Sequence, residues 1–225
     1  MNIVFLTGAG ISAESGISTF RDEKGIWDEK TSKELATLSS WKTNRQNMLD
    51  FYNGRFDTMN NVEPNQAHDL IGLLEQTHDV TVITQNVDDL HERGGSTNVI
   101  HLHGELRKMC SSNNKNLTMP YVPIKIGDKH PDGSQLRPFI VWFGEDVPKM
   151  EEAIQAVRKA DTLIVVGTSL VVYPAASLVR FAKASCELFY VDPKPTQEVD
   201  LQYFTVIEKV ASKGIQEIVE RLIFK

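Results

Sequence analysis

Short runs of apolar residues recur along the chain and alternate with longer stretches in which apolar residues fall every three or four positions. A short run rich in Val, Ile, Leu and Phe predicts a buried strand, whereas the longer period predicts a helix with one apolar face. The runs lie at residues 3–6, 80–84, 99–102, 162–166, 188–191 and 204–207. The helical stretches lie at residues 33–56, 67–75, 87–92, 149–159, 175–184 and 213–222. Strands that alternate with helices predict an α/β fold with a Rossmann-like, doubly wound parallel sheet.

Two segments interrupt this alternation, and we expect them to form a smaller domain. Residues 33–61 are predicted to be a helical insertion, and residues 107–137 a ribbon-like insertion that is polar and rich in Asn, Ser, Lys, Pro and Gly. Residues 139–143 are apolar and aromatic, so we expect them to return the chain to the main architecture as a strand. The larger, Rossmann-like domain is then formed by residues 1–32, 62–106 and 138–225.

The first apolar run ends on closely spaced glycines, Gly8 and Gly10, and a helix is expected to begin after them. Glycine lets the backbone turn sharply and approach a pyrophosphate, and the start of a helix offers free N–H groups. Ala13 replaces the third glycine of the dinucleotide-binding pattern, which tolerates alanine there. A tight strand-to-helix turn in any α/β protein is the alternative, and the acidic residue that the pattern places about 20 positions later is not evident.

Small, amide, carboxylate or imidazole side chains follow the carboxyl ends of several predicted strands. They are Gly8, Gln85, Asn86, His103, Gly167 and Asp192. In an open parallel sheet these ends form one crevice in which ligands bind. We therefore predict one shared site; the alternative is that strands end in polar loops in any fold.

His103 is the candidate for acid–base chemistry, because an imidazole can take and return a proton near neutral pH. A lone histidine on a strand is often a satisfied core residue, and this alternative applies to His103 and to His101 on the same predicted strand face. Asn86 and Asp88 follow a strand, where an amide and a carboxylate suit ribose hydroxyls and an ordered water. Their alternative role is to cap the helix that follows.

Longer motifs give the chain a specific resemblance. They read GAGISAESGI at 8–17, TFR at 19–21, GIW at 25–27, TQNVDDLH at 84–91, HLHG at 101–104, FGE at 143–145 and GTSL at 167–170. In this order they resemble the sirtuins, the NAD-dependent protein-lysine deacylases, over nearly the whole chain. The resemblance implies that the larger domain binds NAD and that the substrates are acylated lysine side chains of proteins.

The resemblance also implies roles for individual residues. The histidine directly before glycine, His103, would be the catalytic base, and Asn86 and Asp88 would assist it. The implied NAD-binding residues are Gly8, Ala9, Gly10, Ser12, Ala13, Glu14, Thr19, Phe20, Arg21, Trp27, Gln85, Asn86, Asp88, Gly167, Thr168, Ser169, Asp192 and Ala211. The implied substrate-binding residues are Ala36, Tyr52, Arg55, Val141, Phe143, Gly144, Glu145 and Val147. The substrate peptide is expected to add as a strand between residues 143–147 and 167–172.

In the reaction that the resemblance implies, the acyl oxygen of a modified lysine attacks C1′ of the nicotinamide ribose, and nicotinamide leaves. His103 then activates a ribose hydroxyl, which attacks the imidate carbon. Water completes the release of free lysine and O-acyl-ADP-ribose. The alternatives are mono-ADP-ribosyl transfer, NAD hydrolysis, hydride transfer by a dehydrogenase, and a non-catalytic NAD sensor.

Ala36, Tyr52 and Arg55 indicate an acidic acyl group. Tyr52 and Arg55 lie three positions apart on a predicted helix and share a face. A guanidinium suits a carboxylate, a phenol can add one hydrogen bond, and alanine leaves room. The pattern resembles that of sirtuins that remove succinyl and malonyl groups, with deacetylation expected as a second activity. The alternative is an amphipathic helix with an exposed arginine, a helix that Gly54 weakens.

Residues 107–137 depart from the sirtuin pattern, in which two Cys-x-x-Cys pairs often hold zinc. Asn113 stands where the partner of Cys110 would be, and no second pair follows. A structural zinc site needs four ligands, and Cys110 and His130 are the only Cys or His residues here. We therefore predict no metal. The side chains expected to hold this segment by packing are Met109, Leu117, Tyr121, Val122, Ile124 and Ile126.

The composition of the 225 residues narrows the classes of partner. The net charge of −6, without a block of Lys or Arg, argues against nucleic acid, and no apolar run approaches membrane-spanning length. A strand is predicted almost directly after Met1, so no signal peptide is expected. The two cysteines are far apart and suit a reducing compartment. We expect a cytoplasmic monomer.

Overall fold

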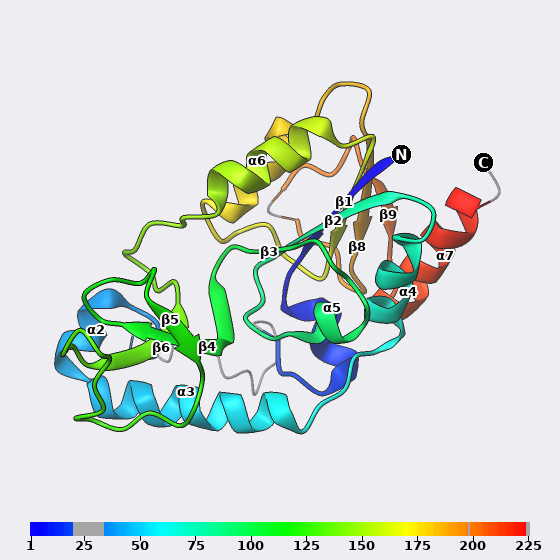
Figure 1. The fold of residues 1–225 in the computed structure, drawn as a ribbon. Helices are drawn as coiled ribbons and strands as arrows, with labels where there is room; N and C mark the ends of the chain where they lie inside the picture. The colour runs from blue at the N-terminus through cyan, green and yellow to red at the C-terminus, as the bar shows by residue number, and fades with distance from the viewer. Residues whose placement is uncertain (20–33, 198, 224–225) are drawn as a thin grey trace.

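The computed structural model describes residues 1–19, 34–197 and 199–223 (Figure 1). Within these residues, six parallel strands form a sheet with the order β3-β2-β1-β7-β8-β9. The strands are β1 (Asn2–Thr7), β2 (Asp79–Thr84), β3 (Val99–His101), β7 (Thr162–Val166), β8 (Glu187–Val191) and β9 (Thr205–Ile207). The predicted α/β fold with a doubly wound parallel sheet is confirmed.

Helices cover both faces of this sheet. Ile3 and Phe5 of β1 pack on one side with helices α4 (Gln66–Leu74) and α7 (Ala211–Ile223). Val4 and Leu6 pack on the other side with helices α6 (Met150–Lys159) and η2 (Ala175–Phe181). Because neither face meets water, the central strands are continuously apolar, which is why they could be recognised in the sequence.

Several predicted helices differ from the helices in the structure. The segments after Gly8 and after Pro174 form short 3-10 helices, η1 (Ala9–Ser15) and η2, which suit a chain that must turn within a few residues. The helix predicted at 33–56 is divided, because Asn44 has φ −133° and ψ 34° and so leaves the helical region. The parts on either side are α2 (Leu38–Thr43) and α3 (Arg45–Asn60). The short helix predicted at 87–92 begins later than expected, as α5 (Leu90–Arg93).

A second, antiparallel sheet has the order β5-β4-β6 among the described residues. Its strands are β4 (Gly104–Ser111), β5 (Thr118–Pro120) and β6 (Leu136–Ile140). The expectation that residues 139–143 return to the main architecture as a strand is wrong, since β6 ends at Ile140 and pairs with β4. The chain enters this sheet at Gly104, whose φ is 86° and where a Cβ would collide with the carbonyl group of Phe139.

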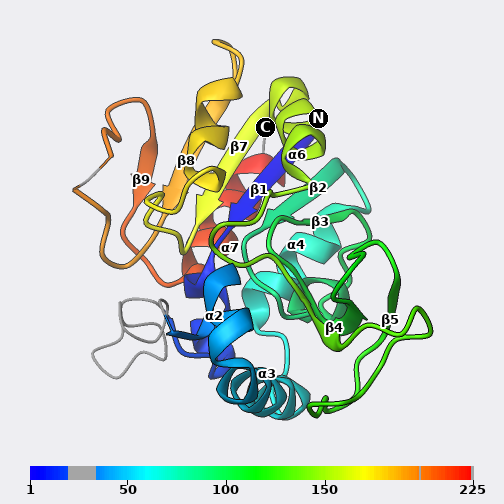
Figure 2. The same cartoon turned by 90° about the vertical axis from the view of Figure 1, so that its left-hand side faces the viewer.

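Helices α2 and α3 pack against this small sheet, at the end of the molecule where β1 runs into η1 (Figures 1 and 2). Their shared core contains Trp41, Met48, Leu49, Tyr52, Leu106, Met109, Tyr121, Ile124 and Trp142. Half of the side chains predicted to hold segment 107–137 are instead exposed, namely Leu117, Val122 and Ile126. The reason is that helix α3, from the other insertion, supplies the apolar surface that covers the sheet. No helix in the described part of the chain is long and apolar enough to cross a membrane.

Two histidines are buried beneath the main sheet, next to the end of β1. The rings of His68 on α4 and His91 on α5 lie 5.0 Å apart, and His91 Nε2 is 3.0 Å from Thr7 Oγ1. Burial lowers the pKa of both rings, to about 4 for His68. Both are therefore neutral in the folded protein near pH 7.

We expect acid to destabilise the fold through this pair. Below about pH 6.5 the unfolded chain takes up protons on these histidines and the folded protein does not. The free energy of unfolding therefore decreases by roughly 1.4 kcal/mol for each ring with every unit by which the pH is lowered. Urea unfolding at about pH 7 and pH 5 measures the effect. His91→Gln should show a smaller loss than the wild type, and His78→Gln, at a position that is only partly buried, should match the wild type. Equal losses in all three proteins would contradict the assignment.

Candidate active site

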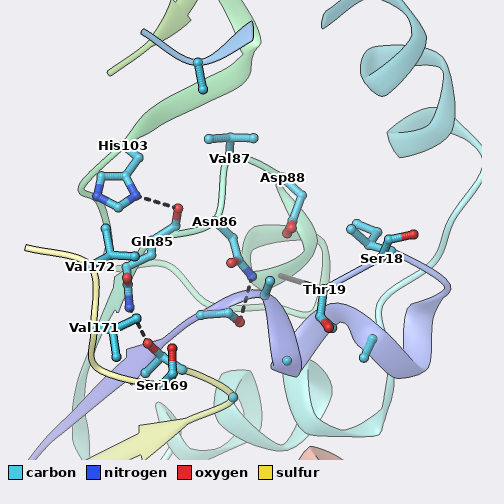
Figure 3. A pocket seen from close by; sticks show the side chains of 18 of the residues that line it. Ser18, Thr19, Gln85, Asn86, Val87, Asp88, His103, Ser169, Val171 and Val172 are labelled. Carbon is cyan, nitrogen blue, oxygen red and sulfur yellow. Dashed lines mark hydrogen bonds between the residues drawn. The ribbon is translucent and has the colours of Figure 1, made fainter. Parts of the chain in front are cut away.

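A cavity of about 480 Å³ opens at the carboxyl ends of β1, β2, β7 and β8, beside the small sheet (Figure 3). The strand order reverses between β1 and β7, and ligands of open α/β sheets bind at such a point. The predicted site residues that line the cavity are Gly8, Ala9, Gly10, Ala13, Glu14, Thr19, Ala36, Tyr52, Arg55, Gln85, Asn86, Asp88, His103, Val141, Phe143, Gly144, Glu145, Val147, Gly167, Thr168, Ser169, Asp192 and Ala211. Ser12 is buried beneath the cavity, and Phe20, Arg21 and Trp27 lie outside the described residues.

The loops after β1 and β7 lock together through their backbones. Gly8 N donates to Val166 O at 3.0 Å, and Gly10 N donates to Gly167 O at 2.9 Å. Gly167 has φ 60°, and a Cβ there would lie 2.5 Å from Ile11 N. This approach is open only to glycine, and Gly8, Gly10 and Gly167 all line the cavity.

We expect Gly167→Ala to lower the free energy of unfolding by about 2 kcal/mol, since it combines a left-handed backbone with a backbone collision. Gly54→Ala is the matched control, because a Cβ at Gly54 in α3 meets nothing within 4 Å. That variant should gain about 0.5–1 kcal/mol from helix propensity. Urea unfolding compares the two, and a Gly167 variant as stable as the wild type would show that the two loops tolerate separation.

Asn86 joins the loop after β2 to the glycine loop. Its Nδ2 donates to Gly8 O at 3.2 Å and to Ser12 Oγ at 3.1 Å. Gly8 O can only accept, which fixes the orientation of the amide and commits its two N–H groups. The side-chain oxygen of Asn86 is therefore the group left to accept a hydrogen bond, for example from a sugar hydroxyl.

Asp88 lies beneath the same wall of the cavity. Its Oδ2 accepts from Ser12 Oγ at 3.2 Å, and its Oδ1 accepts from Leu90 N at 3.2 Å at the start of α5. The second bond lies directly before α5 but does not cap it, because the N-cap position is Asp89 and makes no side-chain capping bond. Burial raises the pKa of Asp88, while these two hydrogen bonds, His101 and Arg55 favour the carboxylate.

His103 follows β3 and is held with one nitrogen toward the loop after β2. Its Nδ1 is 3.1 Å from Gln85 O, as Figure 3 marks with a dashed line. A carbonyl can only accept, so Nδ1 carries the proton and Nε2 keeps its lone pair. Burial lowers the pKa of His103, which keeps the ring neutral near pH 7. The side chain thus has the tautomer and the charge that a general base needs.

His101 faces an acceptor at each of its two ring nitrogens. Its Nδ1 is 3.2 Å from Asn86 O, and its Nε2 is 2.7 Å from Glu92 Oε1. Burial opposes a charge on this ring, but the Glu92 carboxylate outweighs it and raises the pKa of His101. The two histidines therefore hold consecutive carbonyl groups of the 85–86 loop, one as an ion pair and one as a neutral ring.

Ala36, Tyr52 and Arg55 come together at the part of the cavity that is bordered by helix α3 and the small sheet. Trp142 Nε1 donates to the Tyr52 hydroxyl at 2.9 Å. Burial lowers the pKa of Arg55, partly offset by Tyr52 and Asp88, yet an arginine side chain stays charged in proteins. The helix face predicted from the sequence is thus turned into the same cavity as His103.

The carboxylates of Glu145 and Glu14, both predicted to bind ligands, are engaged by the protein. Glu145 forms two hydrogen bonds with Arg137, of 2.9 and 3.0 Å, and an ion pair with Lys115. Burial opposes its charge, but Arg137 outweighs burial and lowers the pKa of Glu145. Glu14 accepts hydrogen bonds from the backbone and hydroxyl of Ser212, at the start of α7. Both carboxylates are therefore held by other residues of the protein in the wall of the cavity.

A further set of lining residues was not among the individual site residues predicted from the sequence. They are Ile17, Ser18, Val87, Ile140, Trp142, Val171, Val172, Tyr173, Pro174, Pro193, Lys194 and Val210. Val171 and Val172 belong to the segment expected beside a peptide, and Pro193 and Lys194 follow a strand end, a signal that could have found them. Trp142 and the buried Arg137 had no comparable signal.

Cys110, the cysteine of the incomplete zinc pattern, is buried, and its thiol lies 3.9 Å from Pro138 O. Burial raises its pKa to about 11, which disfavours the thiolate. After β4, the Ser111 hydroxyl accepts from the backbone of Asn113 and Asn114 and contacts Asp132. In the described residues, hydrogen bonds thus close the turn where many sirtuins have zinc ligands; the absence of zinc stays a prediction.

Comparison with known proteins identifies the family. Residues 8–174 match the model of the Sir2 family. A protein of Bacteroides thetaiotaomicron named NAD-dependent protein deacylase is 48% identical, over 99% of this chain and 98% of its own length. A Helicobacter pylori protein of the same name is 48% identical over 99% and 97%.

Solved structures agree. The crystal structure of a Sir2 homologue with NAD has a TM-score of 0.88 and 38% identity, over 99% of this chain and 89% of that one. A Sir2 complex with a peptide and NAD has a TM-score of 0.81 and 30% identity, over 99% and 94%. The match to the family model, the identity to full-length relatives and the shared fold agree with the resemblance of the motifs. The chain therefore belongs to the Sir2 family.

Proposed function

We propose that this chain is an NAD-dependent deacylase of protein lysines that prefers acidic acyl groups such as succinyl and malonyl. The observation that carries the proposal is that Tyr52, Arg55 and His103 line one cavity. A guanidinium and a phenol beside a base give a deacylase two donors for a substrate carboxylate. Membership of the Sir2 family supports NAD as the cosubstrate.

The residues of the large sheet fit a dinucleotide. The Gly8–Gly10 loop brings bare backbone to the point where the strand order reverses, and Asn86 keeps an acceptor oxygen for a ribose hydroxyl. The Asp192 carboxyl group follows β8, where an acidic residue suits the hydroxyls of the other ribose. When bound, NAD supplies the electrophilic ribose carbon and receives the acyl group.

His103 acts as the general base. Its Nε2 lone pair can take the proton of a ribose hydroxyl, while the Gln85 carbonyl holds Nδ1–H and stabilises the imidazolium that forms. Asn86 positions the sugar, and His101, paired with Glu92, holds the backbone of Asn86 from behind. These roles favour acyl transfer over simple hydrolysis of NAD.

The peptide that carries the lysine lies across the outer rim of the cavity. Phe143, Val171 and Tyr173 are large apolar side chains that are exposed there. The backbone of Phe143 already pairs with Ala36 and Leu38, so the segment after it, residues 144–147, is the part open to a peptide strand. Recognition mainly through backbone groups suits a loose sequence preference.

A comparison of acetyl-, malonyl- and succinyl-lysine peptides of one sequence, each with NAD, tests the proposal. We expect a higher kcat/KM for the two acidic acyl groups, with acetyl as a weaker substrate. An acetyl kcat/KM equal to or above the other two would contradict the acidic preference. A peptide that gains ADP-ribose, or NAD consumed at the same rate without peptide, would favour ADP-ribosyl transfer or NAD hydrolysis.

A further inference from the structure

We propose that Trp142 is the residue that makes the acyl end of the cavity selective for a hydrogen-bond acceptor. Its indole N–H donates a hydrogen bond to the Tyr52 hydroxyl oxygen. The phenol therefore meets the acyl group as a hydrogen-bond donor, through its own proton. The inference rests on the proposed deacylase function and adds a positioning residue to it.

Chemistry fixes the direction of the bond between these two residues. Trp142 Nε1 lies 2.9 Å from the Tyr52 hydroxyl, and an indole nitrogen donates but never accepts. The hydroxyl oxygen must therefore accept, and its own proton is directed elsewhere. The described residues include no acceptor for that proton. Burial raises the pKa of Tyr52, so the proton stays in place.

Both side chains are buried in the protein and also border the cavity. Tyr52 is 1% exposed and Trp142 2% exposed, and both line the cavity together with Arg55. A buried O–H group without an acceptor is energetically unfavourable, and a substrate acceptor can relieve this cost. The phenol proton is thus available to an acyl carboxylate, next to the guanidinium.

The indole of Trp142 is held by a cation and a second aromatic ring and is fixed at its backbone. The Arg137 guanidinium carbon lies 3.4 Å from the centre of a Trp142 ring, and the ring of Trp41 lies 5.2 Å away. Glu145 accepts from Trp142 N at 2.9 Å and pairs with Arg137 through both oxygens. The buried ion pair of Arg137 and Glu145 thereby orients the indole toward Tyr52.

This arrangement determines which acyl groups the cavity accepts. Tyr52 and Arg55 present donors, whereas an acyl group that ends in an ammonium group would face only donors and lose its solvation. A phenylalanine at position 142 would keep the aromatic packing but would free the Tyr52 oxygen. The phenol could then rotate, and its preference for an acceptor would weaken.

Steady-state kinetics of Trp142→Phe, Tyr52→Phe and the double variant test the inference. Trp142→Phe should lower the ratio of succinyl to acetyl kcat/KM by roughly three- to tenfold, the size of one neutral hydrogen bond, mainly through the KM for the succinyl peptide. In the Tyr52→Phe background the same substitution should change the ratio by less than about twofold, since its target is gone. Tyr121→Phe removes a hydroxyl from the same core, one that donates to Asn53 Oδ1 and does not line the cavity, and should leave the ratio unchanged.

Two outcomes would overturn the inference. One is that the losses from Trp142→Phe and Tyr52→Phe multiply in the double variant, which would show that they act independently. The other is that Trp142→Phe lowers both kcat/KM values equally, as a purely structural residue would. A wild-type enzyme without acidic preference would refute the proposed function itself, which separates the two failures.

Discussion

His103→Ala is expected to reduce NAD-dependent deacylation by about 10²–10⁴-fold, the usual contribution of a positioned general base. The reason is that Nε2 of His103 is the lone pair left free for a ribose hydroxyl, while Nδ1 is held by Gln85 O. The measurement is the single-turnover rate of formation of free lysine from a succinyl-lysine peptide. In the proposed reaction His103 acts after nicotinamide has left, so exchange of labelled nicotinamide into NAD should persist in the variant when the acylated peptide is present.

The persistence of exchange separates loss of the base from loss of the fold. His78→Ala is the matched control, since His78 is only partly buried and does not line the cavity, and it should deacylate at the wild-type rate. Should His103→Ala deacylate as fast as the control, His103 is not the base. Should both deacylation and exchange vanish while NAD still binds, His103 acts before nicotinamide leaves.

Arg55→Met is expected to remove most of the preference for acidic acyl groups. A charge-assisted hydrogen bond contributes about 1.5–3 kcal/mol, so the ratio of succinyl to acetyl kcat/KM should fall roughly 10- to 100-fold. Methionine keeps much of the side-chain volume without the charge. The change should appear mainly in the KM of the succinyl peptide, because the guanidinium binds a part of the substrate that does not react.

Arg45→Met, on the same helix α3, controls for the loss of one positive charge. The Arg45 guanidinium lies 4.7 Å from the centre of a Trp41 ring and does not border the cavity. This variant should keep the wild-type ratio. A ratio unchanged in Arg55→Met, or lowered equally in both variants, would show that the guanidinium of Arg55 does not bind the acyl carboxylate.

The main sheet could be predicted from the sequence because its central strands are buried on both faces. Residues 162–166 are apolar at almost every position, and β7 has the predicted bounds. The small sheet could not be predicted, since β5 is three residues long and β6 gains its partner only through the turn at Gly104. The division of the helix at Asn44 likewise depends on local dihedral angles that the apolar period does not encode.

The rule that strand ends converge predicted that most of the candidate residues would lie together, and they line one cavity. His103, Asn86 and Gly167 come from distant parts of the sequence and line one cavity, as the order of a parallel sheet requires. The partners of these side chains were not predictable. The contact of Tyr52 with Trp142 spans ninety positions and arises only because α3 packs on the small sheet.

Mass spectrometry of the products of one turnover with a succinyl-lysine peptide and NAD tests the central claim most directly. The proposed reaction predicts free lysine peptide, nicotinamide and O-succinyl-ADP-ribose in equal amounts, with the acyl group found on the ribose. Free ADP-ribose beside an intact succinyl peptide, or a peptide that carries ADP-ribose, would contradict it.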